Sequence, residues 1–588
     1  MTAPTRYVIL DEALIPWLLW QVARRRAVGV IAVRPAIPPL KRLLDMLVAA
    51  LRRRGLVRLV LDDLPELVPG GGYDNYACAN DHFAESEPWA EGAFDFADAE
   101  ARFDRYGRPL KHLACNYTQT LAFHAEIVDR ILVAVEGARV LGATPELIGL
   151  QRFRTGRVFA DAALPPHRPV RAPVAALMAV GLALFALAWI ILRTRRALAP
   201  PKRYFIVFDH AHHPKESRWW QEFDDAPGGV AVLFRNRGRA DACGGDLNRD
   251  WYVVDSGKVR PGQIPGLARI AVADTLRILT AGWRLPPDLF WQMIKLPFRR
   301  VGYRALFNLF RSEVFFAKDD YNVEHIIRSQ ELRPLGTRHV GVLHGLPAYP
   351  PIMAQYRYLD LDTYFTFGRE WGERFYRSRW PAAMQVIPVG QVNMSREELQ
   401  ALAVPRPKDI GFFLKDLIQT EAVLAIIRAT ALAFPDRTVY VKTKGNPRPA
   451  YGEQVHGRLA GLANVVVTTE DSYTLIPRIN YAFNEPSSLV VECIIYGLFS
   501  YCLVPGTEWK INYFAEFPGL CVRSADDVIA AVRGVEAGSS QYPRAGFAEL
   551  VELSGVVAWD KIRHALGVGP APQPLPHLTF IAERAETR

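Results

Sequence analysis

The stretch from residue 480 to residue 506 changes from an apolar run to a Pro-Ser-Ser turn and then to a helical pattern. Ser487 and Ser488 stand where this helix would begin, so their hydroxyls and the free backbone N–H groups there would favour an anion such as a phosphate. Glu492 follows one turn later, where a carboxylate suits the hydroxyls of a ribose. The alternative is that Ser487 is only an N-cap and that Glu492 is a surface residue.

Three lysines follow apolar, strand-like runs in the same part of the chain. Lys442 and Lys444 belong to "TVYVKTK", and Lys415 holds the equivalent place in "IGFFLKD". A lysine at the carboxyl end of a strand is a mobile point charge that can neutralise a phosphate. A solvated basic loop would have the same composition. The predicted binding set for a phosphorylated ligand comprises Lys415, Lys442, Lys444, Ser487, Ser488 and Glu492.

Two histidine-containing turns could carry proton transfer. The first ends the apolar run "HVGVLHG" with His344 and Gly345. A histidine can accept a proton from a hydroxyl near neutral pH, and a glycine lets the backbone approach a ligand closely. His344 is therefore the first candidate base, and a purely structural histidine is the alternative.

The second turn is "FDHAHHP", which contains Asp209, His210 and His212. Asp209 is the second candidate base, and we expect the two histidines and Gly345 to contact an acceptor substrate. A carboxylate beside imidazoles could also bind a metal ion. Because the spacing is local and the sequence has no second group of ligands, we predict no metal site.

The elements that must position these residues form two alternating series. From about residue 201 to 395, and again from 405 to 535, strand-like runs alternate with helical stretches. This alternation predicts an α/β fold with two Rossmann-like, doubly wound parallel sheets, whose ligands bind outside the carboxyl ends of the strands. A Pro-rich hinge at 403–409 separates the sheets, and residues 536–588 read as a C-terminal helix and a loose tail.

Residues 1–150 predict a smaller α/β domain that precedes the two sheets. Its strands are expected in "RYVILDE", "AVGVIAVRP" and "VRLVLDDL", with helical stretches between them. Residues 82–107 are acidic and aromatic, and we expect them to form a solvated surface rather than to line a groove. The sequence of this domain indicates no role for it.

Residues 172–192 predict one transmembrane helix, because 21 residues carry no charge and Trp189 lies near one end. A buried core helix is the alternative. The basic linker at 151–171 and the segment after the helix are equally positive, so the orientation stays open. A helix that enters the membrane and returns, or that lies in one leaflet, is the alternative to a crossing helix. The stretch 276–311 mixes aromatic and basic residues, which suits either an anionic membrane surface or ordinary amphipathic packing.

The composition narrows the classes of partner. The 588 residues have a formal net charge of +10, which fits a phosphate-bearing substrate or anionic lipid. The chain has neither a Lys/Arg block nor zinc-finger spacing, so we expect no nucleic acid partner. Six cysteines without a C-x-x-C pair favour a reducing compartment.

Three segments resemble a known group of enzymes. "LGTRHVGVLHGLPAYP", "LDTYFTFGREWGERFYRSRW" and "NYAFNEPSSLVVECIIYG" resemble elements of the GT-B glycosyltransferases of bacterial surface and capsular polysaccharide synthesis, and of the related CDP-alditol phosphotransferases. The resemblance covers about residues 201–535. It implies phosphate contacts for Ser487 and Ser488 and a ribose contact for Glu492. Where those families often carry Lys-x-His-Pro, this chain has "KTKGNP", so Lys444 or Asn446 would have to substitute for the histidine.

These observations predict a membrane-associated, metal-independent glycosyltransferase without a cofactor. It would transfer a sugar from a nucleotide-sugar donor to a cell-surface polysaccharide or a lipid-linked glycan, with membrane lipids as further partners. The resemblance implies the bacterial inner membrane, with the catalytic part facing the cytoplasm. Two alternatives stay open: a CDP-alditol phosphotransferase, and a non-catalytic membrane scaffold that keeps the fold.

Overall fold

The chain forms two compact units in the computed structural model. The first comprises Met1–Ala188, Ala268–Phe298 and Met353–Gln355, and the second comprises Trp189–Leu267, Arg299–Ile352 and Tyr356–Arg588. The structure describes residues 6–9, 29–32, 46, 49, 83–134, 138–141, 144–156, 172–210, 219–243, 247, 249–318, 321–343, 345–346, 352–402, 407–414, 420–443, 449–505, 513–539, 542, 544–575 and 578.

The second unit contains a seven-stranded sheet in which every pair of neighbours is parallel. The strand order is β10-β9-β8-β7-β4-β5-β6, so the order reverses between β4 and β7. The strands are β4 (Lys202–His210), β5 (Val230–Phe234), β6 (Asp250–Val253), β7 (Phe310–Ala317), β8 (Arg338–Val342), β9 (Thr363–Thr366) and β10 (Gln385–Pro388). Continuous apolar runs such as β5, which is buried along its whole length, are typical of a sheet covered on both faces.

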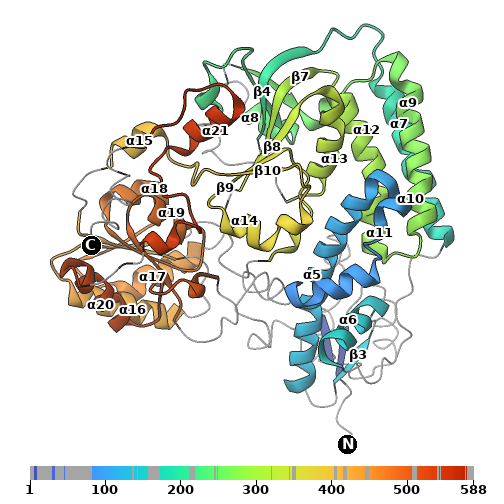
Figure 1. The fold of residues 1–588 in the computed structure, drawn as a ribbon. Helices are drawn as coiled ribbons and strands as arrows, with labels where there is room; N and C mark the ends of the chain where they lie inside the picture. The colour runs from blue at the N-terminus through green and yellow to red at the C-terminus, as the bar shows by residue number, and fades with distance from the viewer. Residues whose placement is uncertain are drawn as a thin grey trace, which may run out of the picture. The chain divides into compact units, whose positions relative to one another are not determined.

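A second parallel sheet follows in the same unit, drawn in orange and red in Figure 1. Its order is β13-β12-β11-β14-β15-β16, which reverses between β11 and β14 in the Rossmann manner. The strands are β11 (Ile410–Phe413), β12 (Val439–Lys442), β13 (Val465–Thr468), β14 (Tyr481–Asn484), β15 (Phe499–Leu503) and β16 (Cys521–Val522). Two doubly wound sheets confirm the predicted fold class.

Helices connect the strands of both sheets. Around the first sheet they are α8 (Arg237–Cys243), α12 (Leu296–Leu306), α13 (Glu324–Leu332) and α14 (Glu370–Phe375); α15 (Arg396–Gln400) lies between the sheets in sequence. Around the second sheet they are α16 (Thr420–Ala433), α17 (Pro449–Leu459), α18 (Ser472–Leu475), α19 (Leu489–Ile495) and α20 (Ala525–Glu536). Local sequence explains several starts: Ser395 and Glu398 form a capping box on α15, which satisfies orphan N–H groups.

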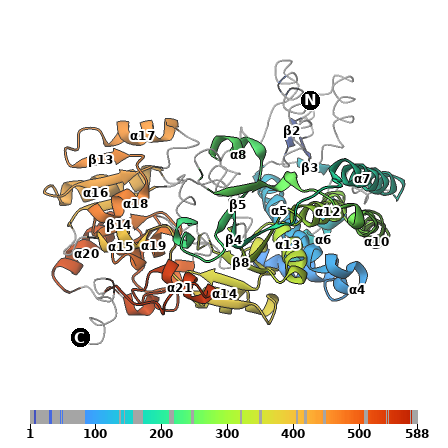
Figure 2. The same ribbon diagram turned by 90° about the horizontal axis from the view of Figure 1, so that it is seen from above.

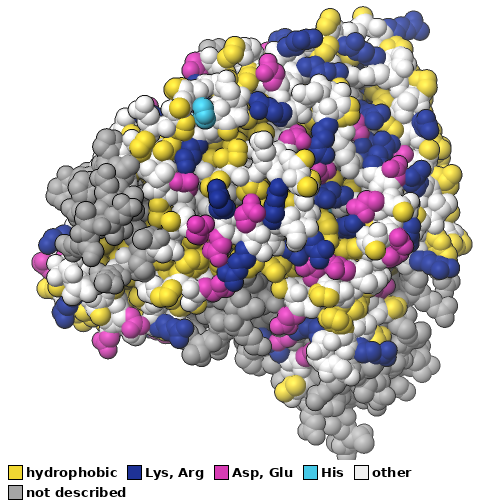
Figure 3. Space-filling model, in the orientation of Figure 1, with side chains coloured by type: hydrophobic (Ala, Val, Ile, Leu, Met, Phe, Trp, Pro, Cys, Tyr) yellow, Lys and Arg dark blue, Asp and Glu magenta, His cyan; other side chains and the backbone are white. Residues whose placement is uncertain are grey.

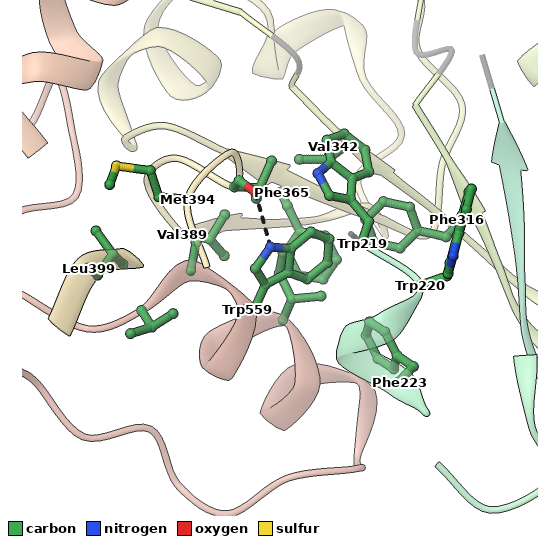
Figure 4. Close-up of a cluster of buried hydrophobic side chains, with 14 of the residues drawn as sticks. Trp219, Trp220, Phe223, Phe316, Val342, Phe365, Val389, Met394, Leu399 and Trp559 are labelled. Atoms are coloured by element: carbon green, nitrogen blue, oxygen red, sulfur yellow. Dashed lines mark hydrogen bonds between the residues drawn. The ribbon is translucent and has the colours of Figure 1, made fainter. Parts of the chain in front are cut away.

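The end of the chain returns to the first sheet. In α21 (Ala558–Leu566), the Trp559 ring packs against Trp219, Phe223 and Phe316, and its Nε1 donates to the Val392 carbonyl at 3.0 Å (Figure 4). Large buried aromatic rings of this kind contribute strongly to a core. One core therefore joins the first sheet, the segment after β10, part of the second sheet's domain and the C-terminal helix.

A glycine marks how closely the returning segment approaches. A Cβ at Gly368, just after β9, would lie 2.1 Å from the Leu550 carbonyl oxygen, so only glycine fits there. Beyond α21, the structure describes residues 567–575 and 578, and Leu575 and Leu578 are buried in the same core.

The first unit contains a smaller parallel sheet of order β2-β1-β3. Its strands are β1 (Arg6–Ile9), β2 (Gly29–Ala32) and β3 (Ala138–Leu141), and its helices include α4 (Ala99–Phe103), α5 (Gly107–Ala134), α6 (Pro145–Thr155), α10 (Thr275–Gly282) and α11 (Pro287–Ile294). The predicted small α/β domain is therefore present. The strand expected in "VRLVLDDL" lies outside the described residues, and β3 was not predicted.

The expectation of a solvated surface at residues 82–107 is wrong. Phe83, Phe94, Phe103 and Tyr106 are buried, whereas acidic residues such as Glu100 are exposed. The segment is an amphipathic surface whose aromatic side chains form the core of the first unit. Composition alone could not separate the two faces, because the charges and the rings alternate at helical spacing.

The predicted membrane segment forms one continuous helix, α7 (Ala172–Arg193). Among the residues that the structure describes, it is the one helix long and apolar enough to cross a membrane. Its length and composition are those of a transmembrane helix, as predicted.

Candidate functional site

The reversal point of the second sheet gathers the first predicted residues. Strands β11 and β14 are neighbours there, with Phe413 paired to Asn484, and the Glu485 backbone N–H donates to the Phe413 carbonyl at 3.1 Å. The chain then turns through Ser487 and Ser488 into α19. In open parallel sheets, ligands bind at this point because the loops of the two flanking strands diverge there.

Glu492 is buried at this turn and is held by three neutral donors. Its side chain accepts from the Ser488 hydroxyl at 2.7 Å, from the Gln391 amide at 3.1 Å, and from the Tyr473 hydroxyl. The residue is 3% exposed, so the alternative of a surface role does not hold. Ser488 is the residue before the helix, yet its side chain does not cap it, because the hydroxyl bonds to the carboxylate.

The segment after β10 supplies part of this network. Gln391 and Asn393 lie between β10 and β11; Asn393 donates to the Tyr473 hydroxyl, and the Tyr496 hydroxyl donates to Gln391. Burial first, and then the charge of Glu492, raise the pKa of Tyr473 and of Tyr496 well above its usual value. Both hydroxyls therefore stay protonated and act as donors. Sequence reasoning missed all four of these polar residues, since none forms a recognisable motif.

The turn after β8 approaches the start of α19. A Cβ placed on Gly345 would lie 3.6 Å from the Ser488 Oγ, which is ordinary contact distance. Gly345 belongs to the first sheet and Ser488 to the second, so two turns singled out by sequence meet. His344 itself lies outside the described residues.

Asp209 is the residue before the last of β4, where the order of the first sheet reverses. Its Oδ2 accepts from the Arg328 guanidinium at 2.8 Å and lies 3.6 Å from Arg235 Nη2. The Asp209 and Arg328 side chains are 0% and 3% exposed, so this is a buried ion pair. Among the described residues, Asp209 Oδ1 has no hydrogen-bond partner.

The remaining predicted residues are described only in part. Lys442 ends β12, and its ammonium donates to the Thr443 carbonyl at 3.3 Å. His210 ends β4, but its side chain is not described, and His212, Lys415 and Lys444 lie outside the described residues. The structure therefore brings together Gly345, Ser487, Ser488 and Glu492, with Asp209 and Lys442 at the carboxyl ends of their strands.

Within the described parts of the chain, no group of three or more His, Cys, Asp or Glu residues could hold an ion. The His210 side chain, His212 and His344 are not among the described residues.

Comparison with known proteins gives structural likeness only. No protein-family model matches the chain, and no curated protein matches it. The chain is similar to UDP-GlcNAc 2-epimerase from Neisseria meningitidis bound to UDP-GlcNAc, at 13% identity, with 66% of this chain and 100% of that chain covered and a TM-score of 0.38. It is also similar to MurG of Acinetobacter baumannii (10% identity, 58% and 92% covered, TM-score 0.32) and to the wall teichoic acid polymerase TagF (11%, 71% and 99%, TM-score 0.36).

These TM-scores are below 0.5, so we take the fold from the topology of this chain. Two Rossmann-type sheets in sequence and a C-terminal helix that returns to the first sheet define it. The fold is of the GT-B type. The first sheet carries the turn after β8, the second carries the Ser488–Glu492 turn, and these two turns lie beside each other.

Proposed function

We propose that the protein is a glycosyltransferase that moves a sugar from a nucleotide-sugar donor to a cell-surface polysaccharide or a lipid-linked glycan. The observation that carries this proposal is the approach of Gly345 to Ser488 at 3.6 Å for an added Cβ. This proximity supports the proposal, because the turn predicted to contact the acceptor and the turn predicted to bind the donor lie beside each other.

On the donor side, residues 405–535 would bind the nucleotide. Glu492 would accept hydrogen bonds from the ribose hydroxyls in exchange for one of its present neutral donors. Ser487 and Ser488 would donate to the diphosphate, and Lys415, Lys442 and Lys444 would neutralise it. Protein cations and donors can stabilise a leaving diphosphate, because such groups act on the charge that develops in the transition state.

On the acceptor side, residues 201–395 would bind the glycan and supply the base. His344 would remove the proton from the acceptor hydroxyl, and His210 and His212 would contact the acceptor. We now assign Asp209 a supporting role, because its carboxylate is buried in an ion pair with Arg328. We place the catalytic part at the cytoplasmic face of the bacterial inner membrane, where nucleotide-activated donors are available.

Calorimetry on the full chain in detergent tests the proposal, with UDP, GDP, CDP and CMP as probes. Selective binding of UDP or GDP is expected, weakened about 10- to 100-fold by Glu492→Gln, because a hydrogen bond to a charged group is worth about 1.5–3 kcal/mol. The matched control is Glu421→Gln, an exposed glutamate on α16 that should not change affinity.

The other outcomes are equally informative. CDP selectivity would move the assignment to a CDP-alditol phosphotransferase that uses the same cleft. No binding of any nucleotide by a chain with an intact thermal unfolding transition would contradict both enzymes and leave the membrane scaffold.

A further inference from the structure

The helix α7 is apolar on all sides, yet its burial follows a helical period. Its buried residues recur at three- to four-residue multiples along the whole helix and lie on one face: Ala175, Ala179, Ala186 and Ile190. The large side chains on the opposite face are between half and three quarters exposed: Val174, Leu177, Val180, Leu184, Phe185, Ile191 and Leu192. A helix that lipid surrounds has no need for this division, whereas a helix with protein on one side and lipid on the other does.

The two faces also differ in side-chain size. The buried face carries mostly alanine, which allows a close approach to a neighbouring helix. The first unit provides a neighbour: α10 runs beside α7 in Figures 1 and 2. At the edge of the exposed face, the Phe185 ring contacts the Phe298 ring with a centroid distance of 5.2 Å. One face of the helix is therefore covered by folded protein, as the burial of Ala175, Ala179 and Ala186 records.

The neighbouring helices add to the apolar surface. Val272, Leu276 and Trp291, in and beside α10 and α11, are 47%, 55% and 41% exposed. Of the seventeen large exposed hydrophobic side chains among the described residues, seven lie on α7 and three on these helices. Monomeric soluble proteins rarely gather exposed apolar side chains in this way, and a gathering marks an interaction site.

Basic residues lie beside the apolar surface in sequence, and their charge indicates which kind of partner the surface binds. Residues 172–200 contain three arginines and no acidic residue. Residues 268–298 contain four basic residues and two aspartates, one of which, Asp274, is paired with Arg105. Where α7 runs in Figure 1, Figure 3 shows hydrophobic side chains interspersed with Lys and Arg. An apolar face with basic flanks is complementary to a bilayer that contains anionic lipids.

We propose that α7 docks into one leaflet of an anionic membrane through its exposed face, together with the exposed side chains of α10 and α11. The alanine face stays against the protein. Chain segments before and after α7 then lie on the same side of the membrane, which resolves the orientation that the flanking charges leave open. This inference does not depend on transferase activity.

Vesicle flotation tests the docking face with the full chain. Wild-type protein should float with vesicles of phosphatidylcholine and phosphatidylglycerol, and at least ten-fold less with phosphatidylcholine alone. The pair Leu177→Gln and Leu184→Gln should reduce flotation on the anionic vesicles at least ten-fold. The control pair, Leu432→Gln and Val466→Gln, alters residues of similar exposure on the second sheet's domain and should leave it unchanged. Equal flotation of the α7 double variant and the control double variant, or no flotation of the wild-type protein, would overturn the proposal.

Thiol labelling tests the sidedness. Arg152→Cys and Arg196→Cys place exposed thiols on either side of α7. In inverted inner-membrane vesicles, a membrane-impermeant maleimide should label both variants above the wild-type background. Labelling of one variant with protection of the other would show a crossing helix and contradict docking in one leaflet. Nucleotide calorimetry on the same proteins reports separately on the proposed transferase.

Discussion

Each of the two sheets holds a buried carboxylate near its reversal point, and the two carboxylates are satisfied differently. Asp209 is bound by the guanidinium of Arg328, with Arg235 close by, whereas the donors to Glu492 include the neutral groups of Ser488, Gln391 and Tyr473. An ion pair compensates a buried charge and holds its geometry. A neutral donor to a carboxylate makes the same kind of hydrogen bond as a ligand hydroxyl, so a ligand hydroxyl can replace it. The ion pair of Asp209 therefore suits a structural role, and the neutral donors of Glu492 suit exchange with a ligand.

The largest expected effect is on the supporting pair. Arg328→Met would leave Asp209 buried without its 2.8 Å partner, and breaking a buried pair costs about 3–5 kcal/mol of the free energy of unfolding. Urea unfolding measures this loss. The exposed pair of Arg237 with Asp241 is the control, and Arg237→Met should change stability by less than about 1 kcal/mol. A small loss for Arg328→Met would mean that water or a third group compensates Asp209.

Substitutions in the hydrogen-bond network of Glu492 should lower stability less than loss of the Asp209–Arg328 pair, and should lower nucleotide affinity more. Tyr473→Phe removes one donor from Glu492 and should cost about 1–3 kcal/mol. Gln391→Leu removes another, and the two effects should not be additive because both donors share one oxygen. A double-mutant cycle in unfolding and in nucleotide affinity measures the coupling. Additive losses in both readouts would mean that Gln391 acts independently of Tyr473 and of the proposed donor site.

The free energy of unfolding should also depend on pH through His339, which lies in β8 of the first sheet. Burial, and then the charges of Arg328 and Arg333, lower the pKa of His339 well below 6.5. Below pH 6.5 the His339 side chain takes up a proton in the unfolded chain but not in the folded chain. The free energy of unfolding should therefore fall as the pH drops from 6.5. His339→Gln should flatten this slope in thermal unfolding, and the exposed His456→Gln should not. An unchanged slope in His339→Gln would assign the effect to other groups.

The smallest expected effect is on stability at the meeting of the two turns. Gly345→Ala would place a Cβ 3.6 Å from the Ser488 Oγ, so the free energy of unfolding should change by less than about 1 kcal/mol. Gly345→Leu would add three further carbons beside Ser488 and should lower turnover more than Gly345→Ala. Equal turnover for both variants would place the acceptor elsewhere.

Much of the architecture could be predicted because parallel strands buried on both faces are continuous apolar runs. Every strand and helix expected between residues 410 and 504 is present. The strand β6 (Asp250–Val253) was missed because it lies at a sheet edge and is short and partly exposed. Residues 82–107 were misjudged because composition does not record which side of a helix faces the core.

The sequence by itself determined the alternation of elements, the Rossmann-type sheets, the apolar helix at 172–192 and the candidate turns, because these depend on local spacing and local polarity. Only the tertiary structure decided that Gln391 and Tyr473 hold Glu492, that Arg328 binds Asp209 across 119 positions of the chain, and that α7 buries one face. These features depend on which distant side chains share one low-dielectric volume. A buried charge must find its partners there, wherever they stand in the sequence.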